Sequence, residues 1–232
     1  MIEDSSLPQP SDSETKRLAI FILLFFAVWT IRAVVFTQFD RAFQPDWLRR
    51  LWYDEIRLLV WVVPVFIYLA KVDRVRPLRF LRLKTAGENL FQASLVTALF
   101  FSVVIAFEYF VENRTIGRAF DLSLEEWINL VWWLPFACWC EEVLFRGFIQ
   151  QKLRLKMNFV GANLLTSVLF VAIHWPGWIM FNGFGASLVT LSAGVFFISL
   201  LLGYLLEETR SLWPCVAAHV LNNVIAGLMA PR

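Results

Sequence analysis

Charged side chains are scarce in this sequence. Asp, Glu, Lys and Arg make up 17% of its 232 residues, whereas soluble domains carry about 25%. Hydrophobic residues make up 59%. Between Met157 and Leu206 the sequence contains no charged residue, and about 20 apolar residues are enough for a helix to cross a bilayer. The scarcity of charge argues against a soluble domain and predicts an integral membrane protein.

Cysteine is scarce too, and the usual metal motifs are missing. The three cysteines, Cys138, Cys140 and Cys215, all lie in apolar runs. Their odd number and the absence of a CxxC spacing argue against a disulfide framework. The HExxH motif of zinc peptidases is absent. The net charge is only +2, with no basic patch in a soluble segment, so we expect no nucleic-acid partner.

The apolar runs predict an all-α fold, a polytopic transmembrane helix bundle. We expect about seven membrane segments, at residues 18–37, 54–70, 89–111, 127–151, 158–176, 185–206 and 213–229. Residues 1–17 are polar, acidic and rich in Ser and Pro, which predicts a disordered cytoplasmic tail. Residues 18–232 would then form one integral membrane domain.

The positions of Lys and Arg predict the orientation of the bundle. They collect in the loop at residues 71–84, at residues 152–156 after the fourth segment, and at Arg210 after the sixth. Because cytoplasmic loops carry an excess of these residues, alternating crossings place the N-terminus in the cytoplasm and the C-terminus outside. We therefore expect a protein integral to the cell membrane, of the bacterial inner or plasma membrane type.

Ionisable side chains deep in a bilayer are costly, so each predicts a specific role or partner. Away from the ends of the predicted segments there are six: Arg32, Glu141, Glu142, Arg146, His174 and His219. The two histidines are the only ones in the sequence. We cannot assign a partner to Arg32 from the sequence.

The fourth segment carries a pair of adjacent glutamates. Glu142 and Arg146 are four residues apart, so they share a helix face and can form an ion pair. Glu141 points about 100° away from Glu142. Two carboxylates beside one cation therefore occupy unlike environments, as general acid and base catalysis requires. An ion pair that only locks helix packing is the alternative, but it leaves Glu141 unexplained.

The two histidines each have a neighbour on the same helix face. Phe170 precedes His174 by four residues, and Asn223 follows His219 by four. An imidazole beside a carboxamide offers two donors that suit an oxyanion. Hydrogen bonds from His174 to the backbone and from Asn223 to another helix are the structural alternatives. Counted from the predicted helix ends at about 1.5 Å per residue, the two histidines lie at different depths and meet only if helices tilt or end elsewhere.

Three patterns thus occur in order on separate predicted helices: EEVLFR from Glu141, FVAIH from Phe170 and HVLNN from His219. In these motifs residues 127–229 resemble the CAAX protease and bacteriocin-processing (CPBP) family of intramembrane proteases, which is related to CAAX prenyl endopeptidase type 2. The resemblance implies an intramembrane endopeptidase that cleaves a membrane-anchored protein or peptide substrate within the lipid bilayer.

The resemblance also implies roles for seven residues. The catalytic ones are Glu141, His174, His219 and Asn223, and the supporting ones are Glu142, Arg146 and Phe170. Glu141 and His174 would activate a water molecule, while His219 and Asn223 would bind the oxyanion. Glu142 and Arg146 would orient Glu141. No covalent intermediate is implied.

Other readings of the same residues remain open at this point. In a metal-dependent mechanism, Glu141, His174 and His219 would hold a zinc ion with one position left for water. We favour the mechanism without a cofactor. A non-catalytic immunity or scaffold protein that retains the family core is the alternative function, and a transporter or proton relay is a third.

Overall fold

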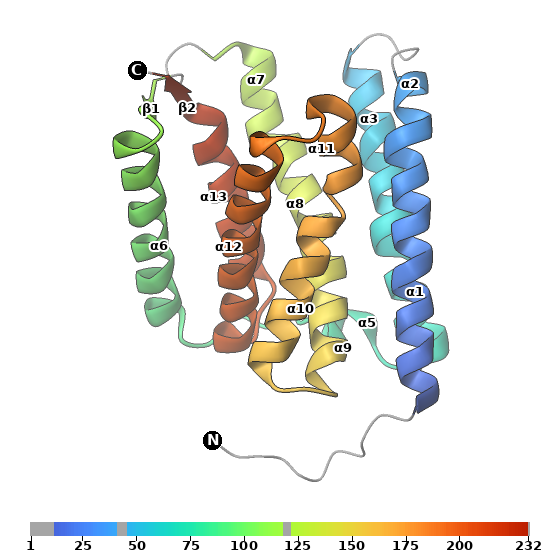
Figure 1. Cartoon of the computed structure of the whole chain (residues 1–232). Coiled ribbons are helices and arrows are strands. Elements are labelled where there is room, and N and C mark those ends of the chain that lie inside the picture. The colour runs from blue at the N-terminus through green and yellow to red at the C-terminus, as the bar shows by residue number, and fades with distance from the viewer. Residues whose placement is uncertain (1–11, 41–45, 118–121, 232) are drawn as a thin grey trace.

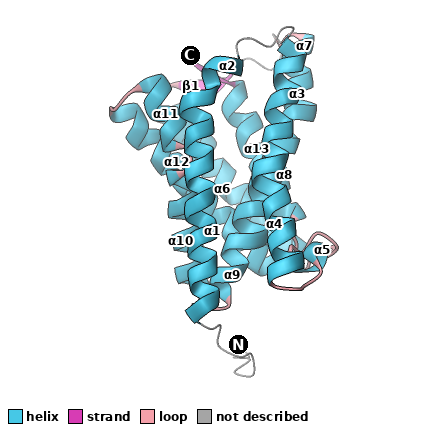
Figure 2. Cartoon of the chain, turned by 90° about the vertical axis from the view of Figure 1, so that its right-hand side faces the viewer, coloured by secondary structure: helices cyan, strands magenta, loops and turns pink. Residues whose placement is uncertain are grey.

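The computed structural model describes residues 12–40, 46–117 and 122–231, and the chain is helical through most of these ranges (Figures 1 and 2). The α-helices are α1 Asp12–Ile31, α2 Thr37–Asp40, α3 Asp46–Arg57, α4 Val63–Ile67, α5 Pro77–Phe80, α6 Leu90–Phe110, α7 Leu124–Ile128, α8 Leu134–Glu142, α9 Gln151–Arg154, α10 Phe159–Ala172, α11 Trp175–Asn182, α12 Ala186–Thr209 and α13 Trp213–Leu228. Wider π-helical turns continue several of them: η1 Arg32–Phe36, η2 Leu58–Val62, η3 Tyr68–Val72, η4 Asn129–Trp133 and η5 Val143–Gln150. The predicted helical bundle is confirmed.

One strand pair was not predicted. The strand β1 (Arg114–Ile116) pairs antiparallel with β2 (Met229–Pro231). This pair joins the segment after α6 to the end of α13 (Figure 1). Strand signals of three residues are too short to recognise in a sequence.

Five helical stretches are long and apolar enough to cross a membrane: Asp12–Phe36, Leu90–Phe110, Leu124–Arg154, Phe159–Asn182 and Ala186–Thr209. They correspond to five of the seven predicted segments. The last predicted segment is the shorter apolar helix α13. The predicted segment 54–70 belongs to a helical run from Asp46 to Val72, whose first part, α3, is rich in charged residues.

The predicted tail at residues 1–17 is only partly within the described structure. Residues 1–11 lie outside it, but Asp12–Arg17 form the start of α1, so the prediction of disorder is wrong for these six residues. Asp12 and Glu14 lie in the first helical turn, where negative charge interacts favourably with the helix dipole.

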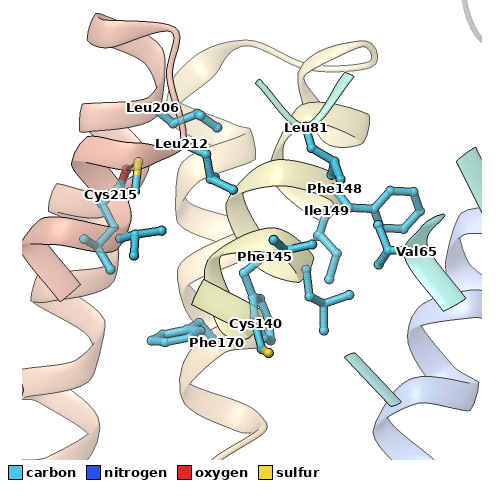
Figure 3. Packing of buried hydrophobic residues seen from close by; sticks show 14 of the residues in the cluster. Val65, Leu81, Cys140, Phe145, Phe148, Ile149, Phe170, Leu206, Leu212 and Cys215 are labelled. Atoms are coloured by element: carbon cyan, nitrogen blue, oxygen red, sulfur yellow. Dashed lines mark hydrogen bonds between the residues drawn. The ribbon is translucent and has the colours of Figure 1, made fainter. Parts of the chain in front are cut away.

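The centre of the bundle is the helix that runs from α8 through η5. Every residue of η5 is buried. The segment contacts η2, α10 and α12, while α8 contacts α3 and α13. Figure 3 shows Phe145 and Phe148 of this segment within the hydrophobic core. The ring of Trp61 packs edge-on against Phe145 and also against Phe25 of α1. A helix buried on all sides is typical of the centre of a membrane bundle.

The segment around α5 closes the end of the bundle where α13 begins. The backbone N–H of Leu212 donates to the carbonyl of Arg82, and the Arg82 guanidinium donates to the carbonyl of Leu206. Leu212 is fully buried. As a result, α13 begins directly after a buried residue, and His219 lies beside the central helix, where it contacts Glu142. This arrangement lets the two histidines approach the same residue.

Gly203 of α12 allows three helices to approach one another. A Cβ atom at this position would lie 1.9 Å from Oδ1 of Asn163 and 2.8 Å from Oε1 of Gln150. The amide nitrogens of the same two side chains donate to the carbonyls of Leu200 and Gly203. The space above the Gly203 Cα atom is therefore filled by the oxygen atoms of two amide side chains, whose nitrogen atoms bind α12.

Replacing Gly203 by Ala should destabilise the bundle. The added methyl group must displace both amide oxygens, and overpacking of this kind costs about 1–3 kcal/mol. Thermal unfolding of the purified protein in detergent measures the effect. Gly194→Ala is the matched control, because Gly194 lies on the same helix and a Cβ there meets no atom within 4 Å. Equal melting temperatures for the two variants would contradict the prediction.

Candidate active site

The two carboxylate oxygens of Glu141 face different neighbours. Oε2 lies 4.0 Å from Nε2 of His174 and 3.8 Å from Nε2 of His219. Oε1 lies 3.6 Å from a terminal guanidinium nitrogen of Arg57. The structure therefore brings three of the four predicted catalytic residues together. It also adds Arg57, the last residue of α3, which none of the sequence motifs indicated.

His174 lies in the tight turn between α10 and α11, where Trp175-Pro176 begins the next helix. Its Nδ1–H donates to the carbonyl of Phe170 at 2.6 Å. The imidazole also stacks on Trp178, with ring centroids 5.1 Å apart, and meets the ring of Phe170 edge-on at 5.0 Å. These contacts fix the ring and leave Nε2 facing Glu141. The predicted contact between Phe170 and His174 is present.

Glu142 contacts His219 on the ring nitrogen that faces away from Glu141. Nδ1 of His219 lies 2.7 Å from Oε1 of Glu142, and the same oxygen accepts a hydrogen bond from Arg146 at 3.1 Å. The predicted pair of Glu142 and Arg146 is thus present, and both side chains are fully buried. The contacts differ from the implied role in one respect. Glu142 touches His219, on another helix, so the pair orients the imidazole and not Glu141.

Arg146 extends this buried network to two more helices. One terminal nitrogen donates to both the carbonyl and the hydroxyl of Ser199 on α12. The Ser199 hydroxyl donates in turn to Ser167 on α10. The guanidinium also lies 4.3 Å from the centre of the Phe170 ring. Phe170 therefore supports the site by packing against Arg146 as well as both histidines.

Asn223 lies one helical turn beyond His219 on α13. Its amide nitrogen donates to Sγ of Cys138 at 3.4 Å, and its oxygen accepts from Asn222. A thiol sulfur is a weak acceptor, so this amide is not committed to a strong partner. Asn223 lines a cavity that Arg57 also lines. Asn223 therefore lies near Glu141 and the two histidines without a hydrogen bond to any of them.

Arg32, which the sequence left without a partner, binds Asp40. One guanidinium nitrogen donates to both carboxylate oxygens at 2.8 and 2.9 Å. The guanidinium also lies 4.4 Å from the centre of the Tyr53 ring. The pair is buried. Through its contact with Tyr53 of α3, Arg32 connects α3 to the helix that follows α1.

Two cavities lie beside Arg57, and Glu141 lines the second of them. The first has a volume of about 370 Å³, and its walls include Arg49, Arg50, Tyr53, Asp54, Arg57, Leu134, Ala137 and Asn223. The second has a volume of about 240 Å³, and its walls include Trp29, Arg32, Tyr53, Arg57, Trp61, Glu141, His174 and Trp178. Tyr53 and Arg57 line both. A substrate chain in the second cavity would lie directly beside the Glu141 carboxylate.

The arrangement does not match a zinc site. Ligand atoms around a tetrahedral zinc ion lie about 3.3–3.6 Å from one another, whereas the imidazole nitrogens lie 3.8 and 4.0 Å from Glu141 Oε2. Among residues 12–40, 46–117 and 122–231, no group of three His, Cys, Asp or Glu side chains is spaced to hold a metal ion. The Arg57 cation beside the carboxylate also opposes a second positive charge. We derive no step through a metal.

The fold and the site together define the class of protein. It is an integral membrane helix bundle with a carboxylate, two imidazoles and a guanidinium beside two cavities. Residues 123–225, which contain all three motifs, match the family model described as type II CAAX prenyl endopeptidase Rce1-like, and this match supports the family assignment. The predicted family is confirmed, and it is a family of membrane proteases. Comparison with curated proteins gave no match, and comparison with solved structures gave none either.

Proposed function

We propose that the chain is an intramembrane endopeptidase that hydrolyses a peptide bond of a membrane-anchored protein or peptide, with Glu141 as the general base. The observation that carries this proposal is the convergence of two imidazole Nε2 atoms on one oxygen of a buried carboxylate. Such a group can bind and deprotonate water.

The partners of His174 support a bound water molecule. Because Nδ1–H donates to the carbonyl of Phe170, the neutral ring has a lone pair on Nε2. Glu141 Oε2 is also an acceptor, and two acceptors 4.0 Å apart need a donor between them. Water placed there donates one hydrogen to each and keeps its own lone pairs for attack on a carbonyl carbon.

The next step moves one proton and one electron pair. As the water oxygen bonds to the carbonyl carbon, Glu141 takes the water proton and the C=O electron pair moves to the carbonyl oxygen. We assign the stabilisation of this oxyanion to Nε2–H of protonated His219 and to the amide of Asn223. Glu142 holds His219 in place. When the C–N bond breaks, Glu141 returns the proton to the leaving nitrogen.

We also propose that the protein lies in the cell membrane with its N-terminus in the cytoplasm. In Figure 1, α5 and α9 lie at the same end of the bundle as the start of α1. The predicted basic loops at residues 71–84 and 152–156 belong to these elements. Because cytoplasmic loops carry an excess of Lys and Arg, this end of the bundle would face the cytoplasm.

Comparative proteomics of membrane peptides tests the proposed function. Cells that produce the wild type and cells that produce Glu141→Ala are compared for new peptide termini in the membrane fraction. We expect a set of termini that depends on Glu141, with equal amounts of both proteins in the membrane. Identical termini in the two strains would support the non-catalytic scaffold instead.

A chelator separates this mechanism from the zinc alternative. Because the imidazole–carboxylate spacing exceeds that of a zinc site, we expect turnover of the purified protein to stay the same after dialysis against a strong chelator. Metal content is measured on the same samples. A loss of turnover that zinc restores would assign Glu141, His174 and His219 as metal ligands.

A further inference from the structure

Arg57 lines both cavities and lies beside the Glu141 carboxylate, which lines the second. Its guanidinium lies 3.6 Å from Glu141 Oε1, on the side of the carboxylate away from the histidines. It also lies 5.9 Å from the ring centres of Trp29 and Trp61. The side chain keeps 20% of its surface exposed, and it lines both cavities. A permanent positive charge thus faces the space in which a substrate would lie.

The hydrogen-bonding capacity of Arg57 is not used up within the protein. A charge-assisted N–H···O bond measures about 2.7–2.9 Å, so the 3.6 Å contact with Glu141 is an ion pair without a close hydrogen bond. Its Nε is buried and makes no hydrogen bond to the protein. A guanidinium carries five N–H donors. Donors of this group remain available for an oxygen atom of a bound substrate.

The position of Arg57 matches that of a developing oxyanion. In the proposed reaction, the attacked carbonyl group lies beside the Glu141 carboxylate, and His219 borders this region from the Oε2 side. Arg57 borders that region from the Oε1 side. Asn223, the other oxyanion donor that we propose, lines the first cavity together with Arg57. Both donors therefore border one space.

We propose that Arg57 is a further catalytic residue, which donates hydrogen bonds to the carbonyl oxygen of the scissile bond. This inference rests on the proposed peptidase function. As water adds, the carbonyl oxygen gains the electron pair and its negative charge is held by the guanidinium. When the C–N bond breaks, the electron pair on this oxygen re-forms the C=O bond, the leaving nitrogen takes the proton from Glu141, and the contact with the guanidinium weakens. A donor that is already charged and oriented stabilises this step most strongly in a site of low polarity.

The competing role for Arg57 is to position Glu141 without touching the substrate. Both roles predict slower turnover when the guanidinium is removed, so turnover alone does not separate them. A peptide in which a phosphinate replaces the scissile amide does separate them. Its anionic oxygen takes the place of the oxyanion, and its binding needs no proton transfer to Glu141.

The experiment compares Arg57→Met and Arg57→Lys with the wild type in detergent. The phosphinate peptide carries the sequence of a cleavage site found by the proteomic comparison. For Arg57→Met we expect kcat to fall by about 10²–10³-fold, KM to change little, and the Kd of the phosphinate to rise by a similar factor to the fall in kcat. Arg57→Lys should recover part of both. Melting temperatures verify that each variant is folded.

Arg154→Met is the matched control. Arg154 pairs with Glu207 on α12 and lines neither cavity, so its loss should leave kcat and phosphinate binding unchanged. Tight phosphinate binding by Arg57→Met, with or without a fall in kcat, would overturn the inference. A wild type that neither cleaves the parent peptide nor binds the phosphinate would contradict the proposed function itself, and the inference with it.

Discussion

Replacing Glu141 by Gln should lower kcat of the purified protein by about 10³-fold or more, with KM close to that of the wild type. A carboxamide has nearly the shape of a carboxylate but cannot accept the water proton, and removal of a general base typically costs 10²–10⁴-fold. Substrate contacts along the two cavities stay as they are, so binding should persist. A fluorogenic peptide assay with the protein in liposomes measures both constants.

The matched control for this substitution is Glu207→Gln. Glu207 also forms an ion pair with an arginine, but it lies near the end of α12 and borders neither cavity. We expect its turnover to equal that of the wild type. Glu141→Gln protein that retains more than a tenth of the wild-type kcat would rule out Glu141 as the base. Such a result would indicate Glu142, the adjacent carboxylate, as the base instead.

Replacing Arg146 by Met should have the largest effect on stability. Arg146 and Glu142 are fully buried, and removing one partner of a buried ion pair costs about 3–5 kcal/mol. The bonds that join Arg146 to Ser199 are lost as well. Chemical unfolding in detergent, followed by tryptophan fluorescence, measures the loss.

Two further variants test the cause of that loss. Arg154→Met removes a half-exposed ion pair with Glu207, which is worth only about 0–1 kcal/mol. In the double variant of Arg146→Met with Glu142→Gln, the carboxylate that Arg146 neutralises is also absent, so part of the stability should return. If Arg146→Met were as stable as Arg154→Met, the buried pair would contribute little to the fold.

Spacing along a helix accounts for the part of the site that could be predicted. The pairs Glu142–Arg146 and Phe170–His174 are four residues apart, so the geometry of the helix alone brings them together. Both pairs are in contact in the structure. Apolar runs likewise predicted the long helices, because the length needed to cross a bilayer is fixed.

Contacts between helices could not be predicted in the same way. Glu142 and His219 are 77 residues apart, and their contact depends on where α13 begins. The predicted start of that helix at residue 213 agrees with the structure, but its depth was not predicted, because the burial of Leu212 beneath the segment around Arg82 leaves no local signal. Arg57 was missed because its partner, Glu141, lies on another helix. A charge at the edge of a predicted segment also resembles an ordinary helix end.

The π-helical pitch of η5 changes how this segment tolerates a deletion. Its turns hold more residues than the 3.6 of an α-helix, so the segment contains about one residue more than an α-helix that turns through the same angle. Deleting one residue between Val143 and Gln150 would favour ordinary α-helical winding and keep the glutamate pair close to its present direction. In an ordinary α-helix such as α10, the same deletion rotates everything beyond it by about 100°. In relatives of this chain, a one-residue deletion in η5 would therefore preserve the site, whereas one in α10 would turn His174 away from Glu141.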